Sequence, residues 1–260
     1  MNQIRAISPL PAAVLWDMDG TLIDTEPYWM QAETDLVTSF GGTWTHDDCM
    51  LLVGSGLPNA AAILQSRGVE MEIDDIVSWL TDRVQQKIEE HGLPWRPGAR
   101  ELLSSFAAAG VPMALVTMSI ERMARQVADL IGADTFTVII AGDMVIESKP
   151  HPEAYLRAAT LLGVDPARCV AVEDSPTGLR AAIAAGTIAI HVPHEVDVPE
   201  SDAHTRWATL AERTLTDISE LCSIRFDLLD DANSAAAPSS SDFEHTNSRA
   251  TAHNHEDATA

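Results

Sequence analysis

Basic residues are scarce in this chain of 260 residues. It has 16 lysines and arginines against 39 aspartates and glutamates, which gives a formal net charge of −23. Nucleic-acid binding needs clustered positive charge opposite the phosphate backbone, so this balance argues against a nucleic-acid partner. A small anionic ligand would meet the same difficulty, because local positive charge would have to overcome the repulsion of an acidic protein.

Cysteine and long apolar runs are also lacking. The three cysteines, Cys49, Cys169 and Cys222, are odd in number and widely spaced, which fits neither a disulfide framework nor a zinc site. A reduced, cytoplasmic setting is the simplest interpretation. No apolar run reaches the ~20 residues that a membrane-spanning helix needs, so we expect no membrane association. The short apolar run at 12–16 ends in an aspartate and is interpreted as a strand rather than a signal peptide.

Apolar residues make up 46% of the chain, enough to bury a core. Short β-branched or apolar runs alternate with alanine- and leucine-rich segments of helical periodicity. This alternation predicts an α/β fold, a doubly wound parallel sheet with helices on both faces. The expected strands are Ala13–Trp16, Pro112–Thr117, Val138–Ala141, Cys169–Glu173 and Ile188–Val192, and the expected helices are Gly98–Ala109, Glu121–Ile131, Pro152–Leu162 and Gly178–Ala185.

Residues 25–93 interrupt the alternation. They carry apolar residues at helical spacing and no clear strands, so we predict a helical insertion there, with the α/β core formed by 1–24 and 94–230. Packing helices without a separate role are the alternative. The segment 231–260 has one aromatic residue and too little apolar surface to offset its ordering entropy. We expect this polar, acidic tail to be disordered.

Two aspartates follow the first expected strand. Ligands of open parallel sheets bind beyond the carboxyl ends of the strands, and Asp17 and Asp19 are two residues apart, so they can face the same side. Adjacent carboxylates repel each other, and a cation or a shared proton is needed to relieve this. A plain acidic turn or a calcium loop are alternatives, but the calcium loop needs a glutamate at its twelfth position, where Tyr28 stands.

A second acidic pair, Glu173 and Asp174, ends a later strand. If the two strands are neighbours, four carboxylates converge, and Mg²⁺ is the natural occupant of such a cluster. A helix cap before Pro176 is the alternative for this pair taken alone. Two other residues could bind an anion. Thr117 precedes the start of an expected helix, although a plain helix cap is the alternative there. Lys149 lies in a loop, although a lysine in a loop is normally solvated.

The order of these groups along the chain resembles the four motifs of the haloacid dehalogenase (HAD) superfamily, over about residues 12–222. The insertion after the first motif is similar to the α-helical cap domain of the branch that contains β-phosphoglucomutase, phosphoglycolate phosphatase and sugar phosphatases. The resemblance implies an HAD-like Rossmannoid core, an aspartyl-phosphate intermediate and a Mg²⁺ cofactor. It implies Asp17 as nucleophile, Asp19 as acid and base, Thr117, Lys149 and the backbone N–H of Met118 as phosphate ligands, and Asp17, the Asp19 carbonyl, Glu173 and Asp174 as metal ligands.

Within this family, the residues favour a Mg²⁺-dependent phosphatase acting on a small phosphorylated metabolite, similar to a sugar phosphate. A departing halide needs no proton, so Asp19 favours phosphate chemistry over dehalogenation. A sugar-phosphate mutase is the alternative, but Leu57 stands where the mutase carries an arginine for a second phosphate. A non-catalytic binding module, which would be expected to lose Asp17 or Asp19, is less favoured. We expect a monomer or a homodimer.

Overall fold

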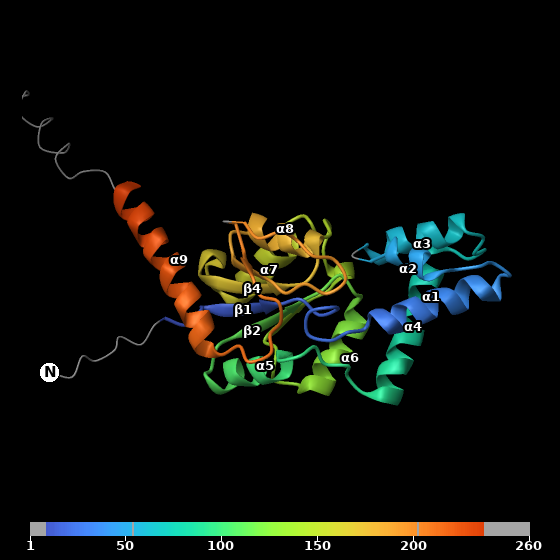
Figure 1. Cartoon of the computed structure of the whole chain (residues 1–260), viewed down its shortest axis with the longest axis horizontal. Coiled ribbons are helices and arrows are strands. Elements are labelled where there is room, and N and C mark those ends of the chain that lie inside the picture. Colours follow the sequence, from blue (N-terminus) through green and yellow to red (C-terminus); the bar gives the residue numbers. More distant parts are fainter. Residues whose placement is uncertain (1–8, 54, 202, 237–260) are drawn as a thin grey trace, which may run out of the picture. The chain divides into compact units, whose positions relative to one another are not determined.

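The protein is described by a computed structural model, which covers residues 9–53, 55–201 and 203–236 (Figure 1). Its centre is a parallel sheet with the strand order β3-β2-β1-β4-β5-β6. This confirms the predicted α/β fold. The strands are β1 (Ala13–Trp16), β2 (Met113–Val116), β3 (Val138–Ile140), β4 (Cys169–Glu173), β5 (Ile188–His191) and β6 (Thr205–Arg206).

The first strand of the chain lies in the middle of the sheet. It pairs with β2 on one side and with β4 on the other, and Val14 is in register with Met113 and with Val170. All strands run the same way, so the loops that follow β1, β2 and β4 leave the same edge of the sheet. The predicted convergence of the two acidic pairs is therefore a direct result of this strand order.

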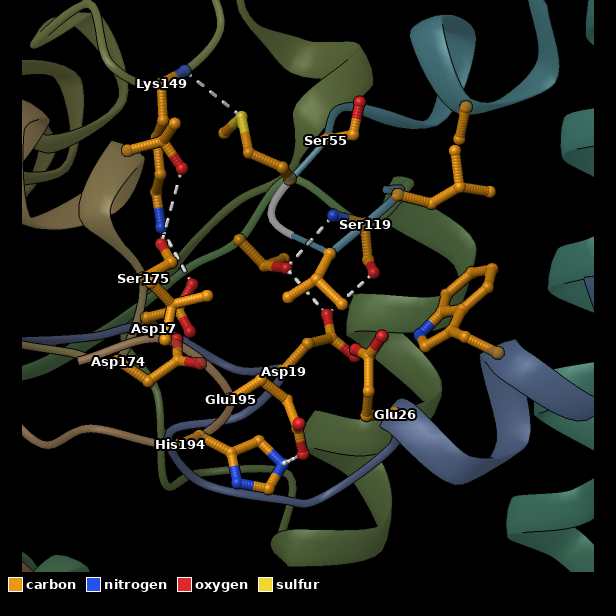
Figure 2. Close-up of a pocket in the computed structure, with 18 of the residues that line it drawn as sticks. Asp17, Asp19, Glu26, Ser55, Ser119, Lys149, Asp174, Ser175, His194 and Glu195 are labelled. Atoms are coloured by element: carbon orange, nitrogen blue, oxygen red, sulfur yellow. Dashed lines mark hydrogen bonds and ion pairs between the residues drawn. The ribbon is translucent and has the colours of Figure 1, made fainter. Parts of the chain in front are cut away.

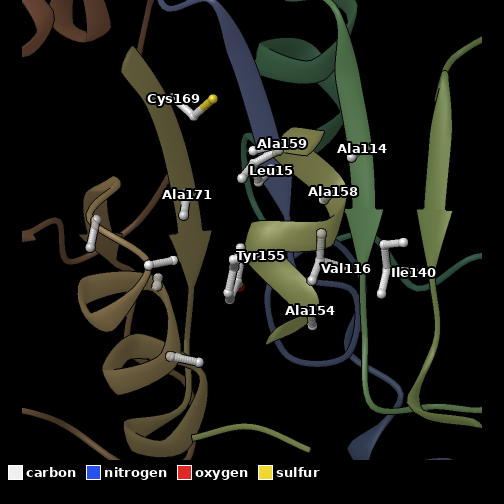
Figure 3. Close-up of a cluster of buried hydrophobic side chains, with 14 of the residues drawn as sticks. Leu15, Ala114, Val116, Ile140, Ala154, Tyr155, Ala158, Ala159, Cys169 and Ala171 are labelled. Atoms are coloured by element: carbon white, nitrogen blue, oxygen red, sulfur yellow. The ribbon is translucent and has the colours of Figure 1, made fainter. Parts of the chain in front are cut away.

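Helices cover both faces of the sheet, as the doubly wound prediction requires. Helices α7 (Glu153–Leu162) and α8 (Pro176–Ala184) lie over one face, and α5 (Ala99–Ala108) and α6 (Glu121–Ile131) lie over the other (Figure 1). Alternate residues of β1 point to opposite faces: Leu15 packs in the cluster under α7 (Figure 3), and Trp16 meets Phe106 of α5 edge to face.

The helical insertion between β1 and α5 also matches its prediction. It consists of α1 (Glu26–Ser39), α2 (His46–Met50), α3 (Leu57–Ser66) and α4 (Ile73–His91). The longest of these, α4, buries Ile76, Leu80, Val84 and Ile88, which recur every four residues and so share one face. The short α2 was not predicted, although Thr45 and Asp48 form a capping box at its start.

The structure differs from the sequence predictions mainly at the C-terminal side. Two elements on that side were not predicted, the two-residue strand β6 and the helix α9 (Leu215–Ala236). Because α9 continues to Ala236, the prediction of disorder from residue 231 is wrong for 231–236. The rest of that segment, 237–260, lies outside the described residues. None of the described helices combines the length and the apolar character needed to cross a membrane.

Candidate active site

A cavity of about 240 Å³ opens at the carboxyl edge of the sheet (Figure 2). The loops after β1, β2 and β4 and the segment after β3 bring the predicted site residues together there. Only Glu173, which is fully buried beneath the floor, does not reach the surface of the cavity. The residues that do line it are Asp17, Asp19, Thr117, Met118, Lys149 and Asp174.

Lys149 lies buried between two acids. Its Nζ donates hydrogen bonds to Asp17 Oδ1 at 2.8 Å, to Glu173 Oε1 at 2.6 Å and to the carbonyl oxygen of Val116 at 2.8 Å. Burial alone would lower the pKa of Lys149, but Asp17 and Glu173 raise it above its ordinary value. The lysine therefore holds a positive charge at the floor of the cavity, which offsets part of the negative charge that an anionic ligand would meet there.

Asp17 has one engaged oxygen and one free oxygen. Oδ1 accepts the bond from Lys149, whereas Oδ2 is buried without a hydrogen-bond partner, and the side chain lines the cavity. Burial and the nearby Glu173 raise the pKa of Asp17 to about 6, against the lowering effect of Lys149. A buried carboxylate oxygen without a partner is uncommon in proteins, and a bound ligand would supply the missing contact.

Glu173 lies beneath the cavity, beside Lys149. Its Oε1 also accepts a hydrogen bond from the Tyr155 hydroxyl at 2.5 Å, and its Oε2 accepts one from Ser175 Oγ at 3.2 Å. Its carboxylate fits against Gly178, where an added Cβ would come within 2.1 Å of Oε2. Protein donors thus engage both oxygens of Glu173, which suits a residue that positions Lys149.

Asp19 is surrounded by hydroxyl groups. Its Oδ1 accepts a hydrogen bond from Thr25 Oγ1 at 2.5 Å, and its Oδ2 accepts bonds from Ser119 Oγ at 2.8 Å and from Thr117 Oγ1 at 3.2 Å. Burial raises the pKa of Asp19 above its ordinary value, although these hydrogen bonds oppose the shift. A carboxyl group that is oriented in this way and readily protonated has the properties of a general acid.

The predicted phosphate ligands lie beside these acids. Thr117 Oγ1 also accepts the backbone N–H of Ser119 at 3.0 Å, so the predicted cap is present together with the contact to Asp19. Met118 lines the cavity, and its sulfur accepts the backbone N–H of Lys149 at 3.4 Å. Thr117, Met118 and Ser119 therefore form one turn that contacts both the general-acid candidate and the lysine segment.

The acidic groups also fit a divalent cation. Asp17, Glu173 and Asp174 offer carboxylate oxygens that all lie within 4.8 Å of one another, and oxygen donors are what Mg²⁺ prefers. Burial, with Asp17 and Glu173 nearby, raises the pKa of Asp174 well above its ordinary value. Gly20 lets the chain pass close to this group, because a Cβ there would lie 2.1 Å from Asp174 Oδ2. A bound cation would give Asp17 Oδ2 a partner. It would also favour the ionised form of Asp174, which burial disfavours.

Several residues at the site escaped prediction. Tyr155, Thr25 and Ser119 contact the predicted acids, and only Ser119, beside Thr117, carried any sequence signal. His194, whose Nε2 lies 3.0 Å from Asp24 Oδ1, also lines the cavity. The helical insertion contributes Glu26, Trp29, Glu33, Leu52, Val53, Ser55, Leu57 and Ala60 to the lining.

Comparisons with known proteins agree with this geometry. Residues 11–186 match the family of haloacid dehalogenase-like hydrolases. Hexitol phosphatase B of Escherichia coli K12 is 31% identical over 224 residues, covering 80% of this chain and 93% of that protein. Protein CbbY of Cereibacter sphaeroides is 33% identical over 192 residues, covering 70% of this chain and 84% of that protein.

Solved structures show the same fold. The crystal structure of CbbY from Rhodobacter sphaeroides in complex with phosphate superposes with a TM-score of 0.73 at 29% identity, covering 80% of this chain and 99% of that one. A β-phosphoglucomutase from Clostridium difficile shares the fold at 20% identity, with a TM-score of 0.71, covering 84% of this chain and all of that one. With its family match over 11–186, the chain belongs to the haloacid dehalogenase-like hydrolases.

Proposed function

We propose that this hydrolase removes the phosphoryl group from a small phosphomonoester of the sugar-phosphate kind, with Asp17 as the nucleophile. The observation that carries the proposal is the partnerless Oδ2 of Asp17, a residue whose side chain lines the cavity. The other oxygen of the same carboxylate is fixed by Lys149 at 2.8 Å. One oxygen is thus oriented and the other is free to attack a phosphorus atom.

The reaction has two steps. Asp17 Oδ2 attacks the phosphorus, the bond to the alcohol oxygen breaks, and Asp19 gives that oxygen its proton. A water molecule then attacks the phosphorus of the aspartyl-phosphate, Asp19 takes the proton of the water, and inorganic phosphate leaves with Asp17 restored. The three hydroxyl groups around Asp19 hold its carboxyl group in place for both transfers.

The remaining charges neutralise the phosphoryl group, and phosphoryl transfer depends chiefly on positioning and neutralisation. We infer that Lys149, the hydroxyl of Thr117 and the backbone N–H of Met118 bind the phosphoryl oxygens. Asp17, the carbonyl of Asp19, Asp174 and, less directly, Glu173 would hold Mg²⁺. The cation would supply positive charge against the developing negative charge on the phosphoryl oxygens.

Hydrolysis is favoured over phosphate transfer back to a sugar. Leu57, at the position where a mutase would need a cation for a second phosphate, lines the cavity as an apolar side chain. The retained Asp17 and Asp19 argue against a non-catalytic binding module. The hexitol phosphatase and a phosphorylated carbohydrates phosphatase of Thermotoga maritima, 33% identical over 178 residues, support a phosphorylated sugar or polyol as the substrate class.

We also propose a cytoplasmic location and an oligomeric state for the protein. The cysteines Cys49, Cys169 and Cys222 are all unpaired and buried, which fits a reducing cytoplasm. A monomer or homodimer with a folded core and a helical cap over the site is the organisation that we propose, with the cap choosing the substrate.

The decisive measurement is phosphate release from a panel of phosphorylated metabolites, with and without Mg²⁺. Wild-type protein is expected to release phosphate only with Mg²⁺, and Asp17→Asn is expected to abolish release while leaving the melting temperature close to that of wild type. Wild-type turnover by Asp17→Asn would remove the basis of the mechanism.

A further inference from the structure

One wall of the cavity carries acids for which the phosphoryl site has no use. Glu26 and Glu33 extend from α1, and Glu195 follows β5. In Figure 2, Glu26 lies beside Asp19, whereas Lys149 lies across the cavity. Because Asp19 would give its proton to the departing alcohol, these carboxylates face the alcohol part of the substrate rather than its phosphate.

Within the described residues, Glu26 and Glu33 have no counter-charge, whereas Glu195 lies 3.6 Å from His194 Nε2. Among the described residues that line the cavity, Lys149 is the sole lysine or arginine, and it is engaged by Asp17 and Glu173. Glu33 is 6% exposed, and Trp44 Nε1 donates a long hydrogen bond of 3.4 Å to its Oε2. No ion pair to Glu26 or Glu33 occurs within the described part of the chain. A carboxylate buried so deeply at the edge of a ligand cavity is normally paired.

The surroundings of Glu26 and Glu33 raise the pKa of both carboxyl groups. Burial and the neighbouring Glu33 and Asp19 raise the pKa of Glu26 to about 8, and burial raises that of Glu33 to about 7. A cation beside Glu26 would offset the repulsion from Glu33 and Asp19 that causes part of the shift in the pKa of Glu26. Trp29, which is 8% exposed, also lines the cavity, and indole rings attract cations.

We propose that Glu26 and Glu33 select the alcohol part of the substrate, and that they favour a phosphomonoester whose alcohol carries a protonated amine. The inference rests on the proposed phosphatase function and narrows its substrate class. An ammonium group would supply the missing counter-charge. A hydroxyl group would be accepted as a hydrogen-bond donor without the ionic contribution. A carboxylate or second phosphate would meet Glu26 and Glu33 without a lysine or arginine beside them, so we expect such substrates to be disfavoured.

A matched series of linear phosphomonoesters tests this selection. The series carries an amine, a hydroxyl or a carboxylate at the end of alkyl chains of increasing length, so that each end group can reach the wall. The measured quantity is kcat/KM for phosphate release with Mg²⁺. At the best length the amine is expected to exceed the hydroxyl by about tenfold, the difference between an ionic and a neutral hydrogen bond. The carboxylate is expected to be slowest.

Glu26→Gln and Glu33→Gln keep the side-chain shapes and remove the charges. Each is expected to lower the ratio of amine to hydroxyl to within about threefold, because a neutral amide loses the ionic part of the contact. Glu101→Gln, which removes an exposed charge on α5, is the matched control and is expected to leave the ratio unchanged. Melting curves of all three variants verify the fold.

Equal or faster hydrolysis of the hydroxyl compounds at every length would overturn the selection while leaving the phosphatase function intact. Retention of the full amine preference in both glutamine variants would overturn the assignment to this wall. Phosphate release from no member of the series or of the metabolite panel would overturn the proposed function, and this inference with it.

Discussion

Replacing Tyr155 by phenylalanine tests how the floor of the site is held together. The Tyr155 hydroxyl donates to Glu173 Oε1 at 2.5 Å, and Lys149 Nζ donates to the same oxygen at 2.6 Å. Tyr155 and Glu173 are both 0% exposed. The substitution removes one of two donors and keeps the aromatic ring, whose centroid lies 5.1 Å from Lys149 Nζ.

The expected loss follows from the burial of this contact. A hydrogen bond to a charged group contributes about 1.5–3 kcal/mol to the free energy of unfolding, and no solvent screens this pair. For a folded unit of this size, each kcal/mol shifts the melting temperature by roughly 2–4 °C, so the variant is expected to melt about 3–12 °C lower. Lys149 keeps its contacts to Asp17 and Val116, so turnover is expected to survive.

Urea unfolding followed by tryptophan fluorescence measures the loss. Tyr28→Phe is the matched control, because Tyr28 is the other tyrosine of the chain, is half-buried, and has a hydroxyl group that makes no hydrogen bond within the described residues. Its unfolding midpoint is expected to equal that of wild type. If Tyr155→Phe proved as stable as Tyr28→Phe, the hydroxyl would not support Glu173, and the account of the floor would be wrong.

Three further outcomes follow from the same contacts. Gly178→Ala would place a Cβ 2.0 Å from Glu173 Oε1, so we expect a loss of about 1–3 kcal/mol in denaturant melts, whereas Gly56→Ala, with open space around its Cβ, should be neutral. Asp19→Asn should slow phosphate release in single-turnover assays by about 10²–10⁴-fold; an unchanged rate would exclude it as the acid and base. The pKa of Glu33, raised from 4.5 to about 7, means that the folded state holds a proton that the unfolded state releases, so this group destabilises the fold as pH rises from about 4.5 to 7. Glu33→Gln should therefore gain about 3 kcal/mol relative to wild type between pH 4.5 and 8 in unfolding experiments, and a gain independent of pH would contradict this.

The parts of the fold that depend on local pattern were predictable from the sequence. β1, β4 and α6 have the bounds that were predicted, because buried runs and capping glycines mark them. The strand β6 has two residues, which is too short for any periodicity, and α9 has mixed polarity along its length. The pattern of apolar residues also does not predict how far a helix continues into a polar segment.

The site divides in a similar way. The groups to which we assign the chemistry follow strand ends, so their positions along the chain predict that they meet. Tyr155 and Glu33 lie inside helices, where a tyrosine or a glutamate has no distinguishing pattern. Their roles arise from which helix face meets the sheet or the cavity, and that is decided by tertiary packing.

The central position of β1 has a consequence for how the protein forms during synthesis. Thr21, just beyond β1, contacts Asp174 across 153 residues of chain. A nascent chain therefore carries Asp17, Asp19 and the whole helical insertion long before Lys149 and β4 emerge. Until then β1 lacks one of its two neighbours and Asp17 lacks its counter-ion. Contacts of such long sequence separation slow folding, and we expect phosphate-binding ability to appear abruptly, once β4 has left the ribosome, rather than grow with chain length.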